Sequence, residues 1–189
     1  MARSIPIVVT LAAALAGCSA DSAHSTGAGA APASSASAPA DPIPPVRDPK
    51  NLAGTPPCAL LTPAQLTANR IDQPGRPKGI VGTPGCEWSD RAYTREISMW
   101  ADIGPDVLHN NYAQRDTYPV FEITQVAGHP AIRTKNLVNG TSCHFVVAAA
   151  EKQTLNVRYT SLRQGLEEPC GPARALAEAV MGNLPPRTG

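Results

Sequence analysis

Cysteine thiols are the side chains best suited to chemistry in this 189-residue chain, and the first of its five cysteines stands apart. Cys18 follows Leu15-Ala16-Gly17 at the end of an apolar run over residues 4–15. The small residues before Cys18 give a signal peptidase access to the bond, and the thiol is the nucleophile that accepts a diacylglyceryl group. We therefore expect residues 1–17 to be a lipoprotein signal peptide and Cys18 to be the lipidation site.

The apolar run is too short for a membrane-spanning helix, because a helix needs about 20 residues to cross roughly 30 Å of hydrocarbon. Its length is typical of a signal peptide instead. An ordinary secretory signal with an incidental cysteine is the alternative. Two or three acyl chains on residue 18 would hold the protein firmly on a bilayer, whereas one chain gives only marginal binding.

The other four cysteines are an even number, as expected for disulfides in an oxidising compartment. Four cysteines allow three pairings. Similar spacings favour sequential pairing, in which each bond ties the end of a helix to a nearby strand. A metal site is the rival interpretation, but the chain has no C-x-x-C or H-x-x-x-H spacing to support one. The cysteines and the pairs we expect are Cys58–Cys86 and Cys143–Cys170.

Motifs for catalysis are missing from the sequence, so we predict no catalytic residue, no metal site and no cofactor. There is no G-x-S-x-G, S-x-x-K or H-E-x-x-H motif, and no glycine loop for phosphate. The histidines are scattered, and we expect His144 to point to solvent, on the strand face opposite Cys143. A hydrolase with an unrecognised site is a remaining alternative. The four histidines are His24, His109, His129 and His144.

Composition divides the chain that remains after cleavage into a tether and one domain. Residues 18–47 contain the lipidated cysteine and a run rich in Ala, Ser and Pro, which cannot bury enough apolar surface to fold. We expect this run to be a disordered tether. Residues 48–186 are the predicted domain, and residues 187–189 are a tail. Lys and Arg total 16 against 15 Asp and Glu. The chain therefore has no excess of basic residues that would indicate binding of nucleic acid.

Local patterns predict a helix, a hairpin, a second helix, a meander and a last helix. Thr62, Pro63 and Gln65 have the types and spacing of a helix start with a capping box. Residues 73–85 are expected to be a loop, and Asp106 is expected to open the second helix. The expected strands cover residues 86–89, 97–103, 120–126, 131–138, 141–150 and 153–159, and the helices cover residues 62–69, 107–115 and 172–184.

Two signals in the second half are stronger than the rest. Asn139-Gly140 is typical of a two-residue hairpin turn of the primed type. In the last helix, apolar residues recur at helical spacing from Ala173 to Leu184, and Pro185-Pro186 ends it. The pattern predicts an α+β fold, with an antiparallel sheet of five or six strands, helices packed on one face, and two disulfides.

Several of these pieces, in this order, resemble a known family. They are the lipobox, the tether, residues 58–64 (Cys-Ala-Leu-Leu-Thr-Pro-Ala), residues 85–88 (Gly-Cys-Glu-Trp), and a Cys170 that opens an Ala-rich helix. The chain resembles a family of actinobacterial secreted lipoproteins whose domain has no assigned function. The resemblance implies an envelope location, four paired cysteines and no known catalytic residues.

We therefore expect a non-enzymatic lipoprotein, anchored by lipid to the outer face of the cytoplasmic membrane. It would bind a small molecule, a lipid or an envelope protein, with no nucleic acid as partner. A structural partner for assembly of another envelope protein is the alternative. An apolar-lined cavity would favour a ligand, and an exposed apolar patch would favour a protein partner.

Overall fold

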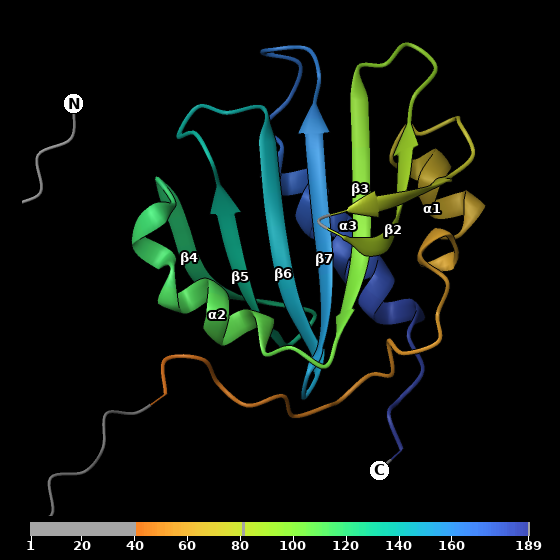
Figure 1. The fold of residues 1–189 in the computed structure, drawn as a ribbon. Helices are drawn as coiled ribbons and strands as arrows, with labels where there is room; N and C mark the ends of the chain where they lie inside the picture. Colours follow the sequence, from red (N-terminus) through yellow and green to blue (C-terminus); the bar gives the residue numbers. More distant parts are fainter. Residues whose placement is uncertain (1–40, 81, 189) are drawn as a thin grey trace, which may run out of the picture. The chain divides into compact units, whose positions relative to one another are not determined.

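The computed structural model describes residues 41–80 and 82–188, which form one seven-stranded antiparallel sheet with helices on both of its faces (Figure 1). The order across the sheet is β1-β2-β3-β7-β6-β5-β4. The strands are β1 (Arg76–Ile80), β2 (Thr83–Ser89), β3 (Arg95–Ile103), β4 (Val120–Val126), β5 (His129–Lys135), β6 (Ser142–Ala150) and β7 (Gln153–Ser161). The helices are η1 (Pro57–Ala59), α1 (Pro63–Ala68), α2 (Val107–Ala113), η2 (Arg115–Thr117) and α3 (Cys170–Asn183).

The predicted signal peptide, Cys18 and most of the predicted tether lie outside the described residues. Within the described part of the chain, none of the helices has the length and apolar character needed to cross a membrane.

The sheet has seven strands, so the prediction of five or six is wrong, and the extra strand is β1. It lies in the segment 73–85, which we predicted to be a loop. β1 has little strand propensity of its own, but it pairs with β2 over the register from Arg76↔Glu87 to Ile80↔Thr83. Arg76 and Lys78 both form ion pairs with Glu87. Pairing with β2, rather than a local pattern, makes this segment a strand.

The main core lies between the sheet and α3, which Figure 1 shows behind the strands. The apolar stripe predicted for the last helix is the face that α3 buries. α1 begins as predicted, because Thr62 caps it and Gln65 completes the capping box. Inward-facing side chains of β2, β3, β6 and β7 complete this core, among them Trp88, Met99, Phe145 and Tyr159.

The other face of the sheet carries α2, and we call it the front face (Figure 1). Leu108 of α2 packs there against Ile132 of β5 and Val146 of β6. Ile43, from a segment that we expected to belong to the tether, joins this second cluster and is buried. The helices are therefore divided between the two faces of the sheet. The prediction that they all pack on one face is wrong.

Both disulfides have the expected sequential pairing. Cys58–Cys86 joins η1 to β2, and Cys143–Cys170 joins β6 to the first residue of α3, with 5.0 Å between the Cα atoms in each pair. Each bond therefore ties a helical segment to the sheet.

Asn139-Gly140 is not a primed two-residue turn, because neither residue has a positive φ. β5 ends at Lys135, so a six-residue loop joins it to β6. The primed turn occurs at Ala127-Gly128, where both residues have a positive φ and Val126 pairs with His129 across the hairpin.

Candidate functional site

A pocket of about 380 Å³ lies on the front face beside α2. Its floor is made by the alternate side chains of β3, β7, β6 and β5 that point away from the α3 core, since successive side chains of a strand point to opposite faces. We call it the front-face pocket. The residues that line it are Thr83, Trp100, Asp102, Val107, Asn111, Tyr118, Thr134, Lys135, Asn136, Ser142, His144, Asn156 and Arg158.

The floor is polar although it is buried. Asn156 on β7 and Thr134 on β5 are each only 2% exposed. The Asn156 Nδ2 atom donates a hydrogen bond to Asp102 Oδ2 at 2.9 Å, and Thr83 Oγ1 donates to Asp102 Oδ1 at 3.3 Å. A buried polar surface is costly unless it is hydrogen-bonded, and on this face a wholly structural core would be apolar.

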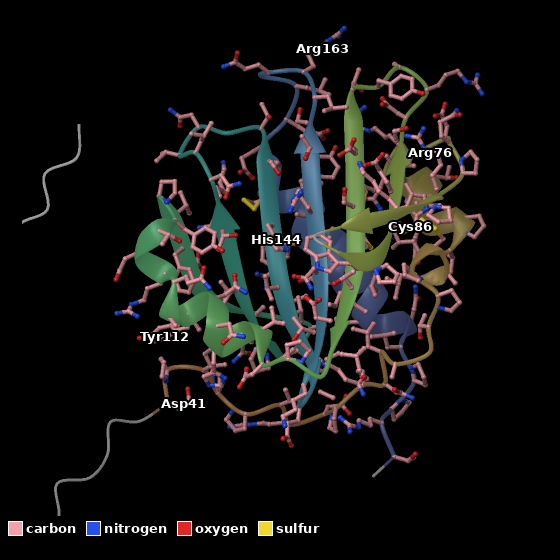
Figure 2. All side chains as sticks on the ribbon, viewed as in Figure 1. Asp41, Arg76, Cys86, Tyr112, His144 and Arg163 are labelled. Atoms are coloured by element: carbon pink, nitrogen blue, oxygen red, sulfur yellow. A yellow bond between two sulfur atoms is a disulfide. The ribbon has the colours of Figure 1, made fainter. Side chains whose placement is uncertain are left out.

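At the centre of this floor are Trp100, His144 and Arg158, which come from three adjacent strands. The rings of Trp100 and His144 stack with 5.1 Å between their centroids. The Arg158 guanidinium lies over the Trp100 ring, with Cζ at 5.3 Å from its centroid. Arg158 is aligned with His144 across the β6–β7 pair. The central position of His144 on the sheet is visible in Figure 2.

His144 has an unsatisfied nitrogen. In the part of the chain that the structure describes, its Nε2 is the one buried side-chain nitrogen or oxygen without a hydrogen-bond partner. Burial, together with the positive charge of Arg158, lowers the pKa of His144 to about 3. The imidazole is therefore neutral near pH 7, and it adds no charge to the pocket.

His144 does lie on the face opposite Cys143, as predicted, but it does not point to open solvent. The prediction assumed that the second face of the sheet is bare. Instead the Trp100 ring covers the imidazole. Trp88 is buried in the core on the α3 side, whereas Trp100 lies on the opposite face, in the wall of the pocket.

A family match accompanies this geometry. Residues 13–183 match the model of a family described as "Protein of unknown function (DUF3558)". The chain belongs to the DUF3558 family. No curated protein and no solved structure matches it.

The sequence did not single out Arg158 or Asn156 of the DUF3558 chain as site residues. One signal was present, because the alternation over residues 153–159 placed both of them on the face opposite Leu155 and Val157. The strands that flank β7 could not be known from this pattern. The other predicted residues do not gather at the pocket, since Cys58, Cys86, Cys143 and Cys170 are in disulfides and His109 and His129 lie elsewhere.

A second hollow of about 700 Å³ lies between residues 41–49, the start of α2 and the β6–β7 turn. At its edge, His109 approaches Asp106 Oδ1 with Nδ1 and Asp41 Oδ2 with Nε2, both at 2.9 Å. Hydrogen bonds with these two carboxylates raise the pKa of His109. The polar atoms at this edge are thus already paired with one another, whereas in the front-face pocket His144 Nε2 is not.

Neither hollow contains a grouping suited to a metal ion. Among residues 41–80 and 82–188, no three His, Cys, Asp or Glu side chains are close enough to hold one.

Proposed function

We propose that this DUF3558 chain is an extracytoplasmic lipoprotein, anchored through Cys18, whose domain binds a small molecule in the front-face pocket without transforming it. The lipobox and the Ala/Ser/Pro-rich run after it support the anchor and the tether. The two disulfides support an oxidising location, since such bonds are rare in the cytosol of most cells.

The observation that carries the proposal is the polar character of the pocket floor. Evolution of a purely structural sheet face would favour apolar contacts with α2, as found at Ile132 and Val146 on the same face. Beside these residues the face changes to buried Asn156 and Thr134, a stacked Trp100 and the unsatisfied nitrogen of His144. Small-ligand pockets of a few hundred Å³ combine aromatic walls with a few such polar groups.

Binding without catalysis is supported by the pKa of the one histidine in the pocket. A general base works best with a pKa near the operating pH, and His144 has a pKa of about 3. It would accept a proton poorly from any substrate at pH 7. Asp102 is held by Asn156 and Thr83, so its carboxylate oxygens are already hydrogen-bonded.

Docking on another envelope protein is a second candidate function, and one observation favours it. Of the five exposed large hydrophobic side chains in the described residues, four lie in loops at one end of the sheet. The antiparallel registers place the β2–β3 loop, the β5–β6 loop and the end of β7 at this same end. Such patches mark interaction surfaces. The four residues are Tyr93, Leu137, Val138 and Leu162.

The experiment that tests ligand binding compares three proteins purified as full chains from membranes in mild detergent. Each is mixed with a small-molecule extract of the source cells, dialysed and analysed by mass spectrometry for retained molecules. Wild type and Arg163→Trp, which changes a loop residue remote from the pocket (Figure 2), should retain the same molecule. Ser142→Trp, at the pocket wall, should lose it.

Circular dichroism and the mass of the disulfide-bonded chain check that all three proteins are folded. Retention of no molecule by wild type, or equal retention by Ser142→Trp, would overturn the proposed ligand site. Loss of a protein partner in a Leu137→Ser/Val138→Ser variant, with no ligand in any protein, would favour the docking function instead.

A further inference from the structure

We propose that the molecule bound in the front-face pocket carries an oxyanion, a carboxylate or a phosphate monoester, and that Arg158 binds it. This inference rests on the proposed function and adds the chemical class of the ligand. Its basis is an arginine that has no ion-pair partner within 4.0 Å, unlike the other buried and half-buried basic side chains of the described residues. Glu96 on β3 interacts with Arg158 only from a greater distance.

Buried and half-buried basic side chains in the described residues form a small set. Four of them have a carboxylate partner within 4.0 Å. Arg158 is the exception, since no carboxylate oxygen of the described residues lies within that distance of its guanidinium. The four paired side chains and their partners are Lys50 with Asp48, Arg95 with Asp90 and Glu167, Arg133 with Glu122, and Lys135 with Glu168.

A partly desolvated cation without an ion-pair partner is costly, and an anionic ligand would supply that partner. The guanidinium has five N–H donors in a planar fork that matches the oxygens of a carboxylate or phosphate. Trp100 lies against it, and contact with an aromatic face restricts where the fork can point. An oxyanion in the pocket would therefore meet a positioned donor group.

The one carboxylate that lines the pocket, Asp102, forms no ion pair with Arg158. Asp102 accepts hydrogen bonds from Asn156 Nδ2 and Thr83 Oγ1, one on each of its oxygens. Its charge also makes the pocket asymmetric, so an anion is favoured near Arg158 and disfavoured near Asp102. His144, aligned with Arg158 on the neighbouring strand, is neutral and adds no charge beside Arg158.

Three probes of similar size test the charge requirement by isothermal titration calorimetry on the full chain. Benzoate and phenyl phosphate carry the two candidate anions, and benzamide is the neutral analogue of benzoate. A phenyl group is chosen because Trp100 and Tyr118 give the pocket aromatic walls. We expect wild type to bind at least one anion at least tenfold more tightly than benzamide. The tighter of the two anions identifies the oxyanion.

Two matched variants separate the role of Arg158 from a general charge effect. Arg158→Gln should weaken binding of the favoured anion at least tenfold and leave benzamide unchanged. Arg163→Gln removes the same charge from a loop away from the pocket and should leave both affinities unchanged (Figure 2). Arg158→Lys keeps the charge without the fork and should fall between wild type and Arg158→Gln. Unfolding midpoints report whether each variant is folded.

Several results would overturn the inference. Binding of benzamide as tight as that of both anions, blocked by Ser142→Trp, would refute the anion class while leaving the ligand site intact. Anion binding that is unchanged in Arg158→Gln would refute the role of this residue. Failure of all three probes, together with no molecule retained from the cell extract, would refute both the inference and the proposed function.

Discussion

Trp100 and His144 stack with their ring centroids 5.1 Å apart, although β7 separates the strands on which they lie. The indole of Trp100 therefore reaches across β7 on the front face. It covers the imidazole of His144 on one side, while the guanidinium of Arg158 lies over the indole itself. This arrangement keeps His144 neutral and partly buried at the centre of the pocket floor.

The buried imidazole makes stability fall as the pH is lowered. The unfolded chain takes up a proton on His144 near the ordinary pKa of 6.5, whereas the folded chain does so only near pH 3. The stabilising contribution is thus present above pH 6.5 and is lost as the pH falls toward 3. Between pH 7 and pH 5 we expect wild type to lose about 2 kcal/mol of unfolding free energy through this group, measured by urea denaturation.

His144→Phe is the matched variant, because it keeps an aromatic ring against Trp100 and removes the titration. Over the same pH interval, its unfolding free energy should fall by about 2 kcal/mol less than that of wild type. His129, whose pKa burial also lowers, is present in both proteins, so its effect cancels in the difference. Parallel pH profiles for the two proteins would show that His144 is not buried as a neutral ring.

Each disulfide should contribute to stability by a similar amount, because the pairs enclose segments of similar length, with separations of 28 and 27 residues. Closing a loop of this size restricts the unfolded chain and is worth about 3 kcal/mol. We expect Cys58→Ala/Cys86→Ala and Cys143→Ala/Cys170→Ala each to lower the unfolding free energy by about that amount. Denaturation of wild type with and without a reducing agent provides the control, and no loss on reduction would contradict the prediction.

Gly75 lies where a side chain has no room. A Cβ at this position would be 2.4 Å from Trp88 Nε1 and 2.8 Å from Cys86 Sγ. Gly75→Ala should therefore force the Trp88 ring or the disulfide to shift, at a cost of about 1–3 kcal/mol in thermal or urea denaturation. Gly79→Ala in β1 meets no atom within 4 Å and should change stability by less than about 0.5 kcal/mol. Equal effects of the two substitutions would contradict this packing.

Elements with a strong local pattern could be predicted from the sequence. The capping box at Thr62 and the apolar stripe of α3 each depend on residues within a few turns of one helix. These residues are close in the sequence, so the pattern can be recognised there. β1 could not be predicted in this way, because its pairing with β2 and the ion pairs with Glu87 depend on the tertiary arrangement. The prediction of a two-residue turn at Asn139 was wrong for a related reason. β5 ends at Lys135, so a longer loop joins it to β6.

Local sequence patterns could not predict the candidate site. Trp100, His144 and Arg158 meet only because β7, the last strand in the sequence, lies between β3 and β6 in the sheet. The alternation over 153–159 could place Arg158 on one face, but not beside Trp100. The arginine also has no motif around it, and its lack of a carboxylate partner is visible only in the folded structure.

Native mass spectrometry of the protein extracted from its own membrane tests the lipid anchor and the bound anion most directly. We predict a chain that begins at an acylated Cys18, contains two disulfides and carries an anionic small molecule, which is absent from Arg158→Gln prepared in the same way. A chain that begins at Met1 with an unmodified Cys18, four reduced cysteines and no bound molecule would contradict this prediction.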